Sequence, residues 1–172
     1  LAESMTSDYR ANGHQRPNPV SFGNCLPNMP AHYVSRMLGV QGPLHTPIAA
    51  CATGTQSLGL ATDLIRTNQS DVVVAGATEA ILQDYIYAGF ASMRALAEGY
   101  EDNPSGASRP FDADRSGFVL SEGSGVLILE EREHALERGA TIYAELAGHA
   151  NTADAYHIAM LEPEAKGMIS AV

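Results

Sequence analysis

Basic residues are scarce in this chain of 172 residues. Ten Lys and Arg stand against twenty Asp and Glu, so the formal net charge is −10, and Lys166 is the only lysine. A dedicated nucleic-acid binder needs a basic face that neutralises phosphates, and docking on anionic lipid needs clustered Lys and Arg. The composition therefore argues against both classes of partner.

Cysteine is equally rare, since Cys25 and Cys51 are the only two. Two thiols cannot build a disulfide-rich secreted scaffold, and free thiols in a reducing cytosol are favoured over a single bridge. No apolar run approaches the ~18 residues that a membrane-spanning helix requires. We therefore expect a cytoplasmic protein with no membrane segment.

Metal chemistry is not indicated either. The six histidines are scattered, and none has the spacing to a cysteine or acid that a metal site requires. Asp112 and Asp114 lie in a polar stretch and are interpreted as solvated loop residues. We expect no bound metal.

Strand-like and helix-like segments alternate along the chain, which predicts an α/β domain. Apolar spacing predicts helices, and short runs rich in β-branched residues, with Gly and Pro at their ends, predict strands. The expected helices cover residues 29–38, 54–66, 80–97 and 130–139. The expected strands cover residues 46–50, 71–76, 117–120, 126–129 and 142–146, with 117–129 forming a strand–turn–strand unit.

Cys51 is the strongest candidate for a chemical role. It lies where a predicted buried strand ends and a predicted helix begins, between the small residues Ala50 and Ala52. A thiol at a helix N-terminus meets backbone N–H groups and the positive end of the helix dipole, which favour the nucleophilic thiolate. A buried, inert core cysteine is the alternative, and inertness is the interpretation we give to Cys25.

The surrounding sequence resembles the β-ketoacyl-acyl-carrier-protein synthases, the condensing enzymes of the thiolase-like superfamily. Its type is most similar to synthase II of bacterial and organellar fatty-acid synthesis. The Ala-Cys-Ala-Thr-Gly motif at residues 50–54 is similar to the nucleophile motif of that family. Further motifs agree in order and spacing at residues 57–59, 71–79, 89–90, 94–96, 108–112, 115–120, 122–125, 129–131, 133–135, 138–140, 142–145 and 154–157.

The resemblance implies a thiolase-like layered α/β fold and a decarboxylative Claisen condensation. In the family, a cysteine accepts an acyl chain from an acyl carrier protein, and a malonyl carrier then supplies the attacking carbanion. Cys51 matches that cysteine. The phosphopantetheine arm arrives on the carrier protein, so the resemblance implies no cofactor of the enzyme itself.

Other site residues are also implied by position. Phe90 matches a phenylalanine that lines the acyl pocket, and Phe118 matches one beside the nucleophile. His157 matches a position at the opening of the pantetheine tunnel, not a catalytic histidine. Arg94 and Arg16 match basic positions near the docking site of the acidic carrier protein. A homodimer is expected for the full-length enzyme.

The chain departs from the family by what it does not contain. The motif Asn-Ala-His-Gly-Thr and the final Gly-Phe-Gly-Gly-Thr loop do not occur, and no lysine precedes either Gly-His pair, at residues 13–14 and 148–149, as it does in the family's later motif. The sequence also begins without Met and stops inside an apolar pattern. We therefore expect the central part of a larger enzyme, with residues 1–140 from the N-terminal half and 141–172 from the beginning of the C-terminal half.

Three hypotheses about these 172 residues stay open at this stage. The first is a piece of the condensing enzyme that is inactive alone. The second is a non-catalytic interaction module with the same fold. The third is a different thiol enzyme that uses Cys51 with His157 as its base. A polyketide ketosynthase is the alternative to a fatty-acid enzyme.

Overall fold

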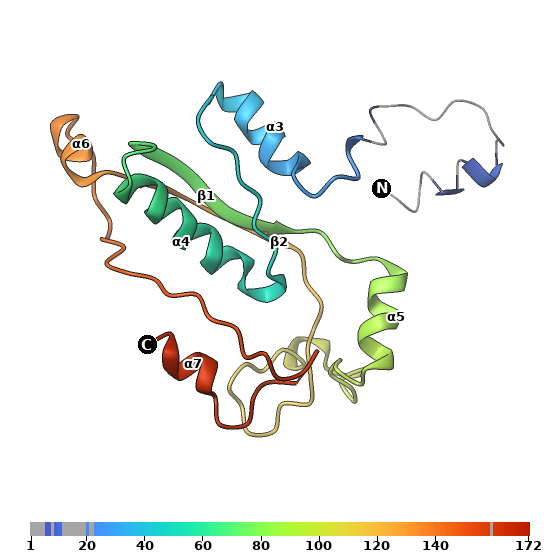
Figure 1. The fold of residues 1–172 in the computed structure, drawn as a ribbon. Helices are drawn as coiled ribbons and strands as arrows, with labels where there is room; N and C mark the ends of the chain where they lie inside the picture. The colour runs from blue at the N-terminus through green and yellow to red at the C-terminus, as the bar shows by residue number, and fades with distance from the viewer. Residues whose placement is uncertain (1–5, 8, 12–19, 21–22, 159) are drawn as a thin grey trace. The chain divides into compact units, whose positions relative to one another are not determined.

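The computed structural model describes residues 6–7, 9–11, 20, 23–158 and 160–172 (Figure 1). The chain divides into two compact units, residues 1–75 together with 128–172, and residues 76–127. In chain order, the elements from residue 29 onward are α3 (Met29–Leu38), η1 (Ala50–Ala52), α4 (Thr53–Arg66), β1 (Val72–Glu79), α5 (Asp84–Ser92), η2 (Pro104–Gly106), β2 (Gly123–Glu130), α6 (Arg132–Glu137) and α7 (Lys166–Ser170). Within the described ranges, no helix is long and apolar enough to cross a membrane.

Helix α3 confirms the sequence prediction for residues 29–38. A proline occupies its first turn, where the missing N–H costs nothing. Gly39 ends the helix with a φ of 69°, a left-handed conformation that glycine adopts without strain. The predicted apolar face is not buried, however, since Met37 is 84% exposed.

Helix α4 confirms the prediction for residues 54–66 and packs against a later part of its own unit. Ala61 and Leu64 on its inner face are buried. His149 approaches the helix closely, because a Cβ added at Gly59 would lie 2.7 Å from the Nδ1 atom of His149. The Nε2 atom of His149 lies 2.9 Å from the Asp63 carboxylate. Two further hydrogen bonds join α4 to the residues around His149.

Those two contacts are hydrogen bonds from side chains of α4. The Gln56 amide donates to Asn151 Oδ1 at 2.9 Å, and the Arg66 guanidinium donates to the Ala147 carbonyl at 2.6 Å. Together they hold the extended segment 147–151 along the length of the helix. This segment leads directly to the loop that contains His157.

Strands β1 and β2 pair in the only sheet among the described residues. Their pairing is antiparallel, because Glu131 donates its N–H to the Asp71 carbonyl at one end while the Ser124 hydroxyl donates to the Ala77 carbonyl near the other. The predicted strand at residues 71–76 is confirmed. A run of β-branched residues is typical of a buried parallel strand, but Val72 is 44% exposed and the described partner of β1 runs antiparallel.

Three strand predictions are wrong. Residues 46–49 and 142–146 are all described and form no strand, and residues 117–120 contribute only a single bridge. The run at 126–129 lies in β2, which pairs with β1 and not with residues 117–120. An isolated apolar run cannot reveal its partner, and Pro47 has no N–H to donate to a ladder.

Two helix predictions were too long. The predicted helix at 80–97 is α5, and it ends at Ser92 because Arg94 adopts a φ of 54°, outside the helical region. The predicted helix at 130–139 is α6, which ends at Glu137 and is followed by Gly139 with a φ of 69°. The proposed division at residues 140 and 141 stays a prediction.

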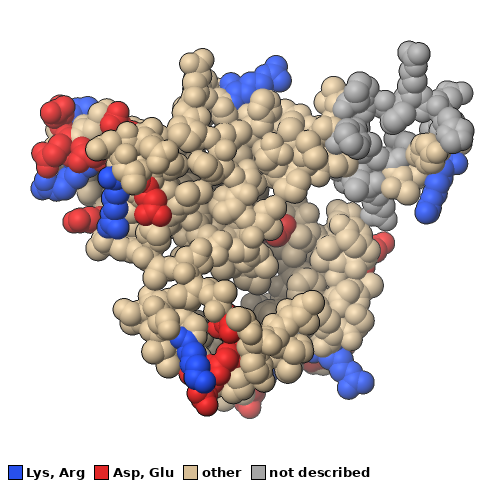
Figure 2. All heavy atoms as spheres, in the orientation of Figure 1, with Lys and Arg blue, Asp and Glu red and all other residues tan. Residues whose placement is uncertain are grey.

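A charged cluster joins the end of β2 to α6, where Figure 2 shows red and blue spheres gathered. The Glu130 side chain is only 9% exposed. It accepts two hydrogen bonds from the Arg138 guanidinium, at 2.7 and 2.6 Å, and its Oε1 atom lies 2.5 Å from His134 Nδ1. The arginine contacts lower the pKa of Glu130 to about 2, with a smaller contribution from His134, although desolvation opposes the shift.

Replacing Glu130 by glutamine is expected to make folding less dependent on pH. The pKa of Glu130 falls from its ordinary value of 4.5 to about 2 on folding, so its stabilising effect is complete above pH 4.5 and is lost as the pH falls towards 2. The difference in unfolding free energy between the wild type and Glu130→Gln should therefore shrink across that range.

Urea unfolding at a series of pH values measures this difference. The matched control is Glu133→Gln, because Glu133 forms an exposed pair with Arg132 and exposed pairs contribute little. A stability difference for Glu130→Gln that stays constant from neutral pH to pH 2 would show that the cluster does not form.

Candidate active site

Cys51 lies in the short 3-10 turn η1, directly before α4. Its side chain is exposed. Ala50 has a φ of 46°, in the left-handed region that costs a residue with a Cβ about 1 kcal/mol. The backbone therefore bends sharply at the residue before Cys51. The prediction that a helix follows Cys51 is confirmed, whereas residues 46–49 before it form no strand.

Hydrogen bonds close the turn around Cys51. The Ala52 N–H donates to the Ala49 carbonyl at 2.9 Å, and the Ala49 N–H donates to the Thr53 hydroxyl oxygen at 2.8 Å. The Ser57 hydroxyl in turn donates to the Thr53 carbonyl at 2.9 Å. Sequence reasoning missed Thr53, because its hydroxyl accepts from the preceding turn and not from its own helix as an N-cap residue would.

This position suits a nucleophile. Backbone N–H groups in the first turn of a helix have no carbonyl partner within that helix, and they meet the positive end of its dipole. Such donors can stabilise the negative charge that develops on an oxygen when a thiolate attacks a carbonyl carbon. The exposed thiol of Cys51 is therefore placed beside groups that can assist acyl transfer.

A hollow of about 710 Å³ lies next to the turn and belongs wholly to the unit that contains Cys51. It is lined by Ala52, the neighbour of Cys51, and by residues between Thr152 and Met168, His157 among them. The structure thus brings the loop of His157 to the same hollow as the turn of Cys51. The role of His157 at the opening of a pantetheine tunnel, which the family resemblance implies, stays a prediction.

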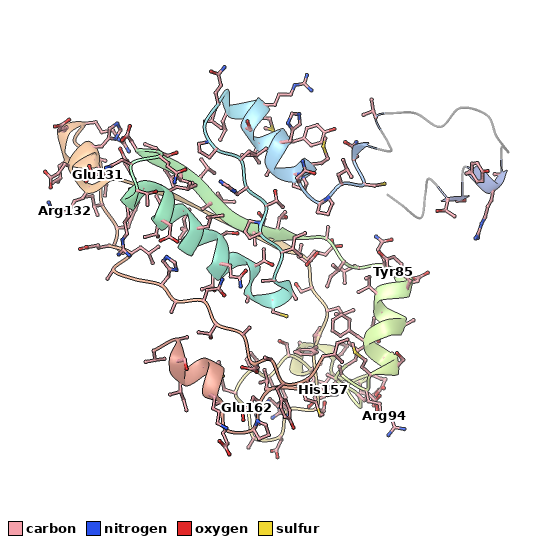
Figure 3. The ribbon with its side chains drawn as sticks, viewed as in Figure 1. Tyr85, Arg94, Glu131, Arg132, His157 and Glu162 are labelled. Carbon is pink, nitrogen blue, oxygen red and sulfur yellow. The ribbon has the colours of Figure 1, made fainter. Side chains whose placement is uncertain are left out.

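The loop that carries His157 is held by hydrogen bonds. His157 Nδ1 accepts the Met160 N–H at 3.1 Å, so the neutral imidazole carries its proton on Nε2. Asp154 accepts the Glu162 N–H at 3.2 Å, and the Thr152 hydroxyl donates to the Gly167 carbonyl at 2.7 Å. Figure 3 labels His157 and Glu162 on this loop, which leads into α7.

Phe90 and Phe118 contact each other within the second unit. Their ring centroids lie 6.1 Å apart at an interplanar angle of 85°, the edge-to-face arrangement that aromatic pairs favour. The Phe118 backbone donates to the Ala95 carbonyl at 2.7 Å and accepts from Ala97 at 2.8 Å. The two aromatic residues predicted from the motifs are thus neighbours.

Of the two arginines predicted near the docking site, the structure describes Arg94 alone. Arg94 is exposed and follows the end of α5, where its positive φ reverses the chain. Its position in the second unit is labelled in Figure 3. Arg16 lies outside the described residues.

An ion pair that sequence reasoning did not predict braces the loop after η2. The Arg109 guanidinium lies 3.0 Å from Asp112 and donates to the Tyr100 hydroxyl at 3.3 Å. The Asp114 N–H and the Arg109 side chain hold the pKa of Asp112 below its ordinary value, with the backbone donor contributing most. Asp112 therefore has a structural partner, and no group of three His, Cys, Asp or Glu side chains in the described ranges could hold a metal ion.

Comparison with known proteins identifies the family. Over residues 2–135 the sequence matches the family described as beta-ketoacyl synthase, N-terminal domain. The chain belongs to this family. The match contains Cys51, Phe90, Arg94 and Phe118, while His157 lies beyond its end.

The curated relatives of this β-ketoacyl synthase chain are named as 3-oxoacyl-acyl-carrier-protein synthases. A mitochondrial 3-oxoacyl-acyl-carrier-protein synthase of Arabidopsis thaliana is 47% identical over 158 residues, which cover 92% of this chain and 34% of the relative. A 3-oxoacyl-acyl-carrier-protein synthase 2 of Rhizobium meliloti is 44% identical over 158 residues, covering 92% of this chain and 38% of the relative. The chain therefore spans little more than a third of the length of these relatives.

Solved structures agree with this assignment. A type II polyketide ketosynthase, solved in complex with its acyl-carrier protein and bound to a hexaketide, shares 39% sequence identity and a TM-score of 0.77. The likeness covers 83% of this chain and 35% of that one. The expected α/β, thiolase-like fold class is thereby confirmed for the part of the β-ketoacyl synthase fold that the chain contains.

Proposed function

We propose that the chain is part of a 3-oxoacyl-acyl-carrier-protein synthase of fatty-acid elongation, in which Cys51 accepts the acyl group. One observation carries this proposal: the thiol of Cys51 is exposed on a strained turn at the start of α4, inside the stretch that matches the family. The full activity includes a decarboxylative condensation of that acyl group with a malonyl group on the carrier protein.

The proposed acyl transfer is a thioester exchange. The Cys51 thiolate attacks the carbonyl carbon of the carrier's acyl thioester and forms a new C–S bond. The C–S bond to the carrier's pantetheine sulfur breaks, and that sulfur leaves as a thiol after it takes up a proton. We propose that the backbone N–H of Cys51 itself supplies one donor to the oxyanion of the tetrahedral intermediate.

We propose that the hollow beside Cys51 admits the pantetheine arm, with His157 at its lining as a binding residue and not as a base. The support is that Ala52 and His157 line the same hollow. We further propose that Phe90 and Phe118 line the pocket for the acyl chain, since their rings form an apolar edge-to-face pair.

The proposed partner is an acyl carrier protein that docks near Arg94 and Arg16. Because the chain carries a net charge of −10, attraction to an acidic carrier must come from such local basic positions. The exposure of Arg94 is consistent with this role. We also propose a homodimer for the full-length enzyme and a cytoplasmic location, although one relative is described as mitochondrial.

The experiment that tests the proposal follows an acyl group from carrier to chain. The purified chain is mixed with acyl carrier protein that bears either a fatty-acyl group or a β-ketoacyl group, and intact-mass spectrometry follows both proteins. We expect the fatty-acyl group to leave the carrier and to add its mass to the chain. An acyl group that stays on the carrier would contradict the proposal, and transfer of the β-ketoacyl group alone would favour the polyketide alternative.

The same mixture tests whether these 172 residues complete the reaction. When malonyl carrier protein is added, we expect acylated chain but no β-ketoacyl product, because the family's two histidine motifs and its lysine are not among these residues. A β-ketoacyl product would contradict the first of the sequence hypotheses, that this piece is inactive alone.

Replacing His157 by alanine separates a binding residue from a base. If His157 only contacts the pantetheine arm, His157→Ala should raise the KM for the acyl carrier protein several-fold and leave the maximal rate of acylation nearly unchanged. Initial rates of chain acylation measured over a range of carrier concentrations give both parameters. Loss of acylation at every concentration would instead assign the base role to His157.

A further inference from the structure

We propose that Thr53 is a positioning residue whose hydroxyl holds the Cys51 thiol in its reactive place. The inference rests on the proposed function, because it concerns the residue that we propose as the nucleophile. Thr53 itself does not touch the reacting atoms in this account. It acts on Cys51 through the backbone of the turn.

The hydroxyl of Thr53 closes a ring around the nucleophile. The Ala49 N–H donates to Thr53 Oγ1 at 2.8 Å, so the two residues that flank the turn Ala50–Ala52 are tied together. The Thr53 N–H also donates to the Ala50 carbonyl. Cys51 lies at the middle of the closed segment.

The turn needs such a tie because packing does not hold it. All three residues of η1 are exposed, and Ala50 is in a left-handed conformation that an alanine rarely adopts. A strained residue persists only where its surroundings over-determine it. In this turn, hydrogen bonds must hold Ala50 in its strained conformation. Among the bonds that close residues 49–53, the one to Thr53 Oγ1 is made by a side chain.

Helix capping does not account for this hydrogen bond. An N-cap side chain accepts N–H groups further along its own helix, and Ala52, the N-cap of α4, makes no such bond. The Thr53 hydroxyl instead accepts from a residue four positions earlier. The bond therefore spans the turn of Cys51 and stabilises that turn directly.

The test measures the rate at which iodoacetamide alkylates each cysteine of the full 172-residue chain, by mass spectrometry of the two cysteine peptides. Thr53→Val removes the hydroxyl and keeps the shape, whereas Thr53→Ser keeps the hydroxyl. Thr55→Val is the matched control, because Thr55 is exposed one position beyond Gly54 on the same helix. Cys25 serves as the internal reference in every variant.

We expect Thr53→Val to slow alkylation of Cys51 by about tenfold, on the scale of one lost hydrogen bond, while Cys25 is unchanged. Thr53→Ser and Thr55→Val should each stay within about twofold of the wild type. A wild-type Cys51 that reacts no faster than Cys25 would overturn the proposed function. A fast wild-type Cys51 whose rate is unaltered in Thr53→Val would overturn this inference alone.

Amide hydrogen exchange on the wild type provides a second measurement, which stands even if Thr53→Val does not fold. The Ala49 N–H is expected to be protected by its bond to Thr53, more strongly than the N–H of the exposed Ile48. An Ala49 amide that exchanges as fast as an unstructured one would overturn the inference.

Discussion

Replacing Cys51 by alanine is expected to lower the rate of acyl transfer to the chain by at least about 10³-fold, because it removes the nucleophile of the reaction. The matched control is Cys25→Ala, which should keep the wild-type rate. The comparison is informative because both thiols are exposed. If exposure of the thiol alone decided which cysteine is acylated, Cys51→Ala and Cys25→Ala would lower the acylation rate equally.

Initial rates of acylation from acyl carrier protein, followed by intact mass, measure this difference. A reduced rate in Cys51→Ala must come with an unchanged far-ultraviolet circular dichroism spectrum, so that the loss reflects chemistry and not folding. Residual acylation at more than a tenth of the wild-type rate would mean that another residue accepts the acyl group.

Replacing Gly76 by alanine is expected to destabilise the fold by about 3 kcal/mol. Gly76 lies in β1 opposite Gly125 and Val126 of β2. A Cβ at this position would collide with the Gly125 carbonyl oxygen and would lie 2.8 Å from the Val126 Cα atom. Both are backbone atoms, so the strands must separate to make room and their ladder hydrogen bonds must weaken.

Gly89→Ala is the matched control, since a Cβ at Gly89 would meet nothing within 4 Å. Gly89 lies inside α5, where alanine is favoured over glycine by about 1 kcal/mol. In chemical denaturation followed by circular dichroism, the unfolding midpoint should therefore fall below the wild-type value for Gly76→Ala and rise above it for Gly89→Ala. Equal unfolding midpoints would show that β1 and β2 do not approach each other as closely as the structure has them.

The elements that the sequence predicted correctly are those with a strong local pattern. Helix α4 follows from Leu58, Ala61, Leu64 and Ile65 at helical spacing, and β1 follows from its run of three valines. These patterns depend on neighbours within one turn or one strand. Such elements can therefore be predicted without knowing which distant residues they contact.

The strand predictions failed where pairing over long range decides the structure. The apolar run 126–129 was assigned to a hairpin with 117–120, yet it pairs with β1, about fifty residues earlier in the sequence. The segments at 46–50 and 142–146 have the composition of strands but make no ladder. Composition indicates that a segment can be a strand, whereas pairing requires a partner that the pattern does not identify.

The residues proposed for the candidate site came from the sequence, whereas the hydrogen bonds that support the turn of Cys51 did not. Cys51 was found from its small neighbours and its place before a helix, and Phe90 and Phe118 were found from the family motifs. Thr53 was not found, because a bond from its hydroxyl to the backbone of Ala49 depends on the φ of Ala50, which the sequence does not reveal. The ion pair of Arg109 with Asp112 was not predicted either, since Asp112 was interpreted as a solvated loop residue.

Peptide mapping of the acylated wild-type chain shows which residue accepts the acyl group, which we propose to be Cys51. After a brief incubation with fatty-acyl carrier protein, the chain is digested at acidic pH, which preserves thioesters, and each cysteine peptide is examined by mass spectrometry. We expect the acyl mass on the peptide that contains Cys51, and an unmodified Cys25. An acyl group on Cys25, or on neither cysteine while the carrier loses its acyl group, would contradict this proposal.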